Sequence, residues 1–176
     1  LKSYMLIFSL IALGLEYSIE CRFVNVYLNG EYNGLYLLTE TVKTGEERVN
    51  IELDTSSNEV PFLLELDMKI IQDNPNYMET IDDEMFLVDN NKYNGKVYPF
   101  GTKYPDSFKD ITSEQYRYIK DYIKETFNSC RMGNYEDYID VDSFINYFLI
   151  QELFMNVDLD YSSVYMYKPM EEKLKF

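Results

Sequence analysis

The 176-residue sequence contains no histidine and no tryptophan. The absence of histidine excludes Ser-His-Asp and Cys-His catalysis, zinc sites with histidine ligands and imidazole acid–base chemistry within these residues. Any proton transfer that this chain carries out must therefore use carboxylates, tyrosines, lysines or cysteines.

Cysteine is also scarce, because Cys21 and Cys130 are the only two. Two cysteines cannot complete a zinc site by themselves, and this pair is too far apart in sequence for a redox motif. We expect two reduced and buried thiols.

Basic residues are few, with 16 Lys and Arg against 31 Asp and Glu and a net charge of −15. Such a charge repels phosphate backbones and anionic lipids, which argues against nucleic-acid and membrane-surface binding. It would attract a basic protein partner or a divalent cation. Long apolar runs are absent too: residues 4–15 are too short to span a bilayer, and we expect a buried helix ended by Gly14.

What the chain has is enough apolar residues for one globular domain, since 46% of it is hydrophobic, with 18 Tyr and 11 Phe. The expected elements run in the order helix, several strands, then helices. This order predicts an α+β fold with an antiparallel or mixed sheet and C-terminal helices. No repeat or interdomain linker is evident, so residues 1–176 are expected to form a single domain.

The clearest local prediction is a β-hairpin. Residues 22–28 have the composition of a strand, residues 29–34 carry two Asn-Gly pairs that suit a turn, and residues 35–40 return as the partner strand. The two-residue period places Tyr36, Leu38 and Glu40 on one face, so an acid ends an apolar row.

Further strands are expected at residues 49–51, 61–67, 85–88, 96–98 and 164–168. Thr112 and Gln115 form a predicted capping box, and Asp140 is predicted to cap a second helix that runs to about Met155. Both helices carry an apolar stripe, formed by Tyr116, Ile119, Ile123 and Phe127 in the first and by Phe144, Tyr147, Phe148 and Phe154 in the second.

Asn156 and Asp158 follow the second helix, where an apolar helix gives way to a strand. Phosphoryl transfer needs an acid that receives a hydroxyl proton and oxygen ligands for Mg²⁺, and these two side chains are of the right kind. The alternative interpretation is structural, because Asn and Asp after a helix often serve as caps or turn formers.

Four stretches of the chain resemble the CotH-type spore-coat protein kinase family in their order and approximate spacing. They are residues 23–40, residues 62–67, residues 103–106, and residues 142–153 continuing through 156–158 to 165–168. The first and last stretches are long and distinctive, and the resemblance covers nearly the whole chain.

The resemblance implies an atypical protein-kinase-like fold that transfers the γ-phosphoryl group of ATP to Ser or Thr of a partner protein, with Mg²⁺ or another divalent metal. It implies that Asp158 is the catalytic base and that Asn156 orients this acid or binds the metal and cofactor. Glu40 would pair with a phosphate-binding lysine, and Glu65 and Asp67 would lie near the cleft. Family members occur in spore coats and in secreted or cell-surface proteins.

The sequence also departs from the family pattern. It lacks the Trp-Asp-x-Asp motif expected after Lys168, the lysine-bearing strands expected upstream and any Gly-rich phosphate loop. We therefore expect a fragment that is incomplete at both ends, with kinase activity residing in the parent protein. An alternative is a non-catalytic surface or assembly module with the same fold. A two-carboxylate glycosidase is disfavoured, because the sequence does not give carboxylate separations.

Overall fold

The computed structural model describes residues 15–69, 85–89, 97–106, 109–157, 161 and 163–176. The helix expected over residues 4–15 lies outside these ranges except for its last residue. The elements are β1 (Cys21–Leu28), β2 (Glu31–Thr39), β3 (Phe62–Leu66), β4 (Met85–Asp89), β5 (Val97–Tyr104), α4 (Ser113–Met132), the 3₁₀ helix η1 (Tyr135–Asp137), α5 (Val141–Leu153) and β6 (Val164–Lys168). The α+β class is confirmed.

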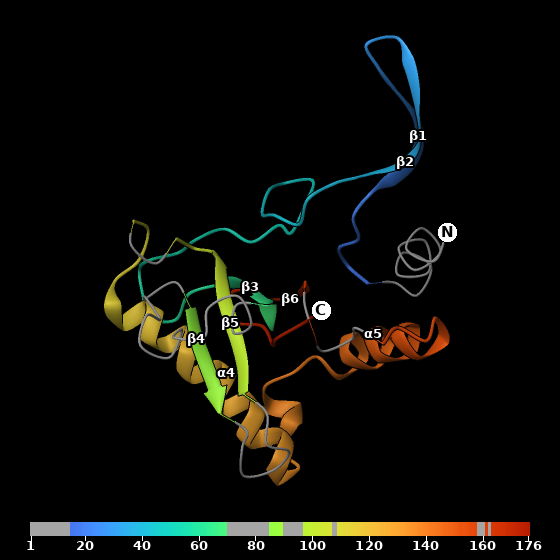
Figure 1. Cartoon of the computed structure of the whole chain (residues 1–176). Helices are drawn as coiled ribbons and strands as arrows, with labels where there is room; N and C mark the ends of the chain where they lie inside the picture. Colours follow the sequence, from blue (N-terminus) through green and yellow to red (C-terminus); the bar gives the residue numbers. More distant parts are fainter. Residues whose placement is uncertain (1–14, 70–84, 90–96, 107–108, 158–160, 162) are drawn as a thin grey trace.

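Strands β3 to β6 form a four-stranded sheet in the order β4-β5-β3-β6, and all three pairings are antiparallel. Helix α4 lies along one side of this sheet, and α5 lies beyond β6 (Figure 1). The predicted strands at 61–67, 85–88 and 164–168 are confirmed. The strand predicted at 96–98 is only the start of the longer β5.

Strands β1 and β2 form the predicted hairpin, which stands apart from the four-stranded sheet (Figure 1). Its turn is shorter than expected, because β2 begins at Glu31. Asn29 and Gly30 alone make the turn, with φ of 51° and 87°, as the type I′ turn requires. The second Asn-Gly pair lies inside β2, where the register shifts and Gly34 adopts a φ of 125° opposite Val26.

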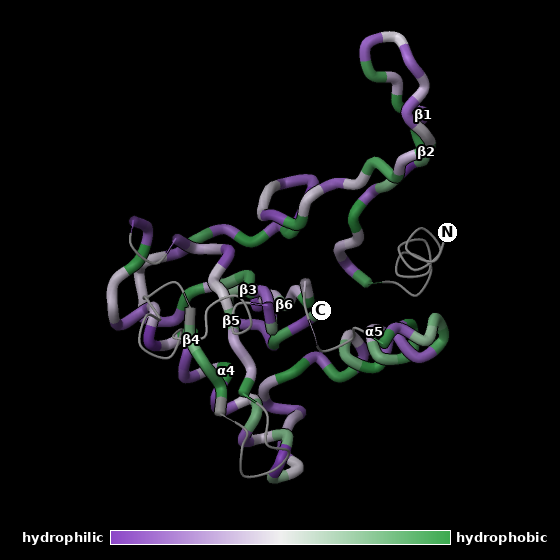
Figure 2. The backbone as a smooth tube through the Cα atoms, in the orientation of Figure 1, coloured by the Kyte–Doolittle hydropathy of each residue, from purple (hydrophilic) through white to green (hydrophobic). Residues whose placement is uncertain are grey.

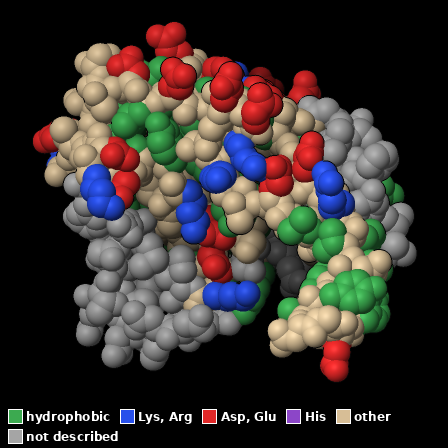
Figure 3. Space-filling model, turned by 90° about the horizontal axis from the view of Figure 1, so that it is seen from above, with side chains coloured by type: hydrophobic (Ala, Val, Ile, Leu, Met, Phe, Trp, Pro, Cys, Tyr) green, Lys and Arg blue, Asp and Glu red, His purple; other side chains and the backbone are tan. Residues whose placement is uncertain are grey.

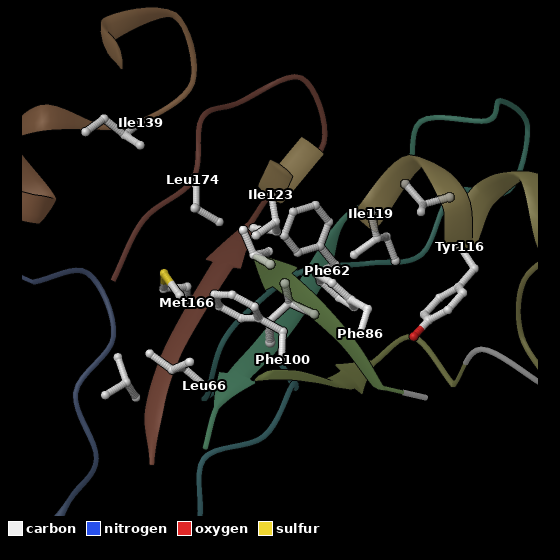
Figure 4. Packing of buried hydrophobic residues seen from close by; sticks show 14 residues of the cluster. Phe62, Leu66, Phe86, Phe100, Tyr116, Ile119, Ile123, Ile139, Met166 and Leu174 are labelled. Carbon is white, nitrogen blue, oxygen red and sulfur yellow. The ribbon is translucent and has the colours of Figure 1, made fainter. Parts of the chain in front are cut away.

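The main core lies between α4 and one face of the sheet. Because side chains alternate along a strand, Phe62, Leu64 and Leu66 of β3 point to this face, and each is at most 6% exposed. They meet Ile119 and Ile123, two members of the apolar stripe predicted for α4 (Figure 4). The prediction that the apolar stripe of α4 faces the core is therefore confirmed.

The opposite face of the sheet has a second, smaller core. Leu63 of β3 and Tyr167 of β6 are buried there against Val49 and Ile51. The prediction of a strand at residues 49–51 is wrong, because apart from an isolated bridge between Thr44 and Val49 this segment has no strand structure. Its alternating apolar residues instead serve to cover the sheet.

Both helix starts were predicted correctly. Thr112 and Gln115 form the reciprocal capping box of α4, and Asp140 caps α5 by accepting a hydrogen bond from the Ser143 backbone N–H. The apolar stripe of α5 is partly wrong, because Phe148 is 52% exposed. The helix is hydrophobic around much of its circumference (Figure 2), so the spacing alone did not determine its buried side.

The two cysteines are free thiols, but the expectation that they are buried is wrong. Cys21 is half-buried at the start of the projecting hairpin, and Cys130 is exposed in the last turn of α4. Within the described ranges, no helix combines the length and the hydrophobicity needed to cross a membrane.

A buried lysine joins β6 to the loop before β3. The Lys168 ammonium donates to Glu59 at 2.9 Å and to the Pro169 carbonyl at 3.2 Å, and its side chain is 2% exposed. The Tyr118 hydroxyl also donates to Glu59, at 3.0 Å. The hydrogen bond from Lys168 is the main reason why the pKa of the Glu59 carboxyl is lowered.

We predict that Glu59→Gln lowers the free energy of unfolding by about 1–3 kcal/mol at neutral pH, because Lys168 would keep its charge without an ionised partner. This is less than the cost of breaking a fully enclosed pair, since Glu59 is partly exposed. A carboxyl with a lowered folded-state pKa stabilises above its unfolded pKa and loses that contribution as the pH falls. Urea unfolding at pH 7 and pH 3 should therefore show a difference between variant and wild type that shrinks at pH 3.

The matched control for this prediction is Glu52→Gln, at an exposed glutamate in the same loop region. It should leave the unfolding midpoint near that of wild type. An equal loss in both variants would contradict the role given to the Lys168 contact.

Candidate functional site

A cavity of about 660 Å³ lies on the face of the sheet that α4 does not cover. Its floor comes from Leu63, Tyr165 and Tyr167, and its walls come from residues 15–19, residues 40–43 and residues 46–49. Its remaining side is closed by Tyr147 and Gln151 of α5, by Asn156 and by the chain around β6. We refer to it as the large cavity.

Glu40 lines the large cavity from the base of the hairpin. Its backbone N–H donates to the Glu20 carbonyl and its carboxylate accepts from the Glu20 N–H, both at 3.0 Å. The same carboxylate forms an ion pair with Arg48 at 2.5 Å. The Glu20 N–H is the largest influence that lowers the pKa of Glu40, followed by Arg48, so this carboxyl is held ionised.

Among the described residues, the cation that pairs with Glu40 is therefore Arg48. Sequence reasoning missed Arg48, because it lies in a polar stretch with no periodic pattern. Lys43 also lines the large cavity, so two cations stand near Glu40 along its wall.

Asn156 lines the same cavity, and the end of α5 sets its position. The Asn156 N–H donates to the Gln151 carbonyl at 2.9 Å, and the Met155 N–H donates to the Glu152 carbonyl at 3.0 Å. This pair of bonds is a Schellman motif, with Met155 in the left-handed region at a φ of 49°. The Asn156 amide also donates to the Gln151 side chain at 2.6 Å, and Gln151 is 3% exposed.

Asp158, the predicted catalytic base, lies outside the described residues. Of the described residues before and after this gap, Asn156 and Ser163 line the large cavity, whereas Val157 is 91% exposed. The structure therefore brings together Glu40 and Asn156, two of the three residues predicted for the site, although they are far apart in the sequence.

A hydrogen-bond network closes the end of the large cavity near the N-terminal wall. Glu16 accepts from the Tyr167 hydroxyl at 2.9 Å and from the Lys175 ammonium at 3.0 Å. Burial alone would raise the pKa of Glu16, but these donors outweigh it and the net shift is downward. Burial, together with the neighbouring Glu16, raises the pKa of Tyr167, so this hydroxyl stays protonated and acts as a donor.

A second polar cluster lies on the same face of the sheet. Glu65 accepts from the Tyr165 hydroxyl at 2.8 Å and forms an ion pair with Lys103 at 2.6 Å. Tyr165 lines the large cavity. Asp67 accepts from the Lys69 N–H at 2.9 Å. Sequence reasoning did not single out Tyr165 and Tyr167, although their two-residue spacing within one strand places both side chains on this face.

The lining of the large cavity suits a nucleotide in size and in its aromatic surface, but its acids outnumber its bases. Four glutamates stand against one lysine and one arginine. Acidic side chains also predominate on the face shown in Figure 3, with lysines and arginines spread among them. An anionic ligand would therefore need a counter-cation when bound.

The described residues do not by themselves form a metal centre. Among them, no group of three or more Asp, Glu, His or Cys side chains could hold an ion. Asn156 has a carboxamide, a group whose oxygen is of the type that Mg²⁺ accepts, and Glu40 is paired with Arg48.

The protein-family model described as CotH kinase protein matches residues 5–176 of the chain. The chain belongs to the CotH kinase protein family. The large cavity is the candidate functional site of this family member. No curated protein matches the chain, and no solved structure matches it.

The Schellman motif yields a stability test. Met155 is 77% exposed and has a left-handed conformation that a side chain disfavours, so Met155→Gly should raise the free energy of unfolding by about 0.5–1 kcal/mol. Met132→Gly is the matched control, because Met132 is equally exposed but ends the regular part of α4. It should lower stability by about 0.5–1 kcal/mol.

Thermal and urea unfolding measure both effects. Losses in both variants would contradict the left-handed geometry at Met155, and with it the position that this cap gives to Asn156.

Proposed function

We propose that this chain is part of an atypical Ser/Thr protein kinase that transfers the γ-phosphoryl group of ATP to a partner protein. The observation that carries the proposal is that Glu40 and Asn156, from opposite halves of the chain, line one cavity. Membership of the CotH kinase protein family supports a kinase-related function.

The composition of the large cavity supports ATP as the nucleotide. Its volume of about 660 Å³ lies within the range of small-molecule sites, roughly 300–1,000 Å³. The rings of Tyr17, Tyr147 and Tyr165 offer surfaces for a base, and Lys43 and Arg48 offer positive charge for phosphates. The excess of acids supports a divalent cation accompanying the nucleotide.

In the proposed reaction, Asp158 accepts the proton of a Ser or Thr hydroxyl while the oxygen of that hydroxyl bonds to the γ-phosphorus. The bond between the γ-phosphorus and the bridging oxygen breaks, and ADP leaves with that electron pair. Asn156 holds the chain that leads into Asp158, and the carboxamide oxygen of Asn156 is the proposed metal ligand. The ion pair between Glu40 and Arg48 holds both side chains in place on the wall of the large cavity that faces the phosphates in this proposal.

The proposed partner is a protein with Ser or Thr acceptors and a basic surface. The net charge of −15 favours a basic partner over nucleic acid, because opposite charges speed association. The family association supports a location in a spore coat, at a cell surface or outside the cell.

A non-catalytic binding or assembly module is the second candidate. It is favoured by the apolar side chains that the projecting hairpin exposes, which are Phe23, Tyr27, Leu28, Tyr32, Leu35, Tyr36 and Leu38. Such exposure is typical of a surface that contacts another molecule.

The substitution Asp158→Asn, made in the complete protein, separates the two candidates. It should lower phosphate transfer from γ-labelled ATP to a basic Ser-rich acceptor by ~10²–10⁴-fold, because the variant amide cannot accept the proton. Thermal unfolding should remain at the wild-type temperature. Transfer is measured with Mg²⁺ and with Mn²⁺.

Asp121→Asn is the matched control, since Asp121 is an exposed acid on α4 far along the chain from the cavity residues. It should leave transfer unchanged. Equal transfer by the Asp158 variant and wild type would refute the proposed base, and no transfer by wild type with either metal would favour the binding module.

A further inference from the structure

A second cavity, of about 390 Å³, lies on the other face of the sheet from the large cavity. It is an open hollow lined by the sheet residues Leu66 and Phe100, by Phe127 of α4, by Phe148 of α5 and by Phe176. We refer to it as the apolar cavity. No role in phosphate transfer is assigned to it.

The described lining of the apolar cavity contains no charged side chain. The hydroxyl of Thr126 is turned to its own helix, where it donates to the Tyr122 carbonyl at 2.8 Å. The thiol of Cys130 lies at the exposed edge. Burial raises the pKa of Tyr147, which also lines the cavity, to about 12, as expected of a phenol among apolar groups.

We propose that the apolar cavity is a binding site for an uncharged, hydrophobic small molecule with an aromatic or branched hydrocarbon body. A hydrocarbon body that binds against this apolar lining removes apolar surface of both partners from water. A charged ligand would lose its hydration without gaining a partner from the lining.

The edge of the cavity supports this occupant. Phe148 is 52% exposed although it lines the cavity, so a bound molecule would remove its ring from water. The concave volume matches a small molecule, since small-molecule sites begin at roughly 300 Å³. A partner protein could place only a side chain in this space.

The probe for the test is N-phenyl-1-naphthylamine, an uncharged aromatic molecule that fluoresces strongly when it leaves water. We expect saturable binding to the chain with one probe per molecule. The two free cysteines provide an internal control, because Cys130 lines the cavity whereas Cys21 lies on the hairpin. With the probe at about ten times its Kd, alkylation of Cys130 by N-ethylmaleimide should slow by about tenfold, and that of Cys21 should not change.

Two variants that fill the cavity complete the test. Cys130→Phe and Thr126→Leu, one turn apart on α4, should each weaken probe binding by about tenfold or more, whereas Cys21→Ser, on the hairpin and outside the cavity, should bind as wild type does. Circular dichroism checks that each variant is folded. Wild-type affinity in both filled variants, absence of saturable binding, or equal protection of both cysteines would each overturn the proposal.

This outcome is independent of the kinase proposal, because none of its readouts uses ATP. A chain that binds the probe at the apolar cavity but transfers no phosphate would retain this site and lose the proposed function. A chain that transfers phosphate but does not bind the probe would support the proposed function and refute the proposed binding site.

Discussion

The structure depends on the burial of β3 on both of its faces. This central strand hydrogen-bonds to β5 on one side and to β6 on the other. Its even-numbered side chains pack against α4, and Leu63 packs against the segment around Val49 and Ile51. A one-residue shift of register would move every side chain of β3 to the other face and would bury Glu65 against α4. The positions of β6 and of the large cavity follow from this strand.

The sequence predicted those parts of the fold that local chemistry decides. The Asn-Gly turn, the capping box at Thr112, the Asp140 cap and the apolar stripe of α4 were all confirmed, because each depends on residues within a few positions. The errors arose where long-range packing decides. Residues 49–51 alternate like a strand but instead cover the sheet, and Phe148 is exposed on a helix that is apolar around much of its circumference.

The same division applies to the candidate site. Glu40 and Asn156 were selected from the sequence, and the structure places both at one cavity. Arg48 was missed, because its contact with Glu40 joins a loop to the base of a hairpin and leaves no pattern in the sequence. Gln151 was missed for a similar reason. It reads as one polar position in an apolar helix, yet it is buried and accepts from the Asn156 amide.

One feature of the fold ties the two cavities together. The rings of Tyr147 and Phe176 stack with centroids 3.9 Å apart and planes 5° from parallel, and both residues line both cavities. The stacked rings of Tyr147 and Phe176 thus form part of the wall of each cavity. A substitution at either position therefore changes the lining of both cavities at once, so its effect on one cavity is accompanied by an effect on the other.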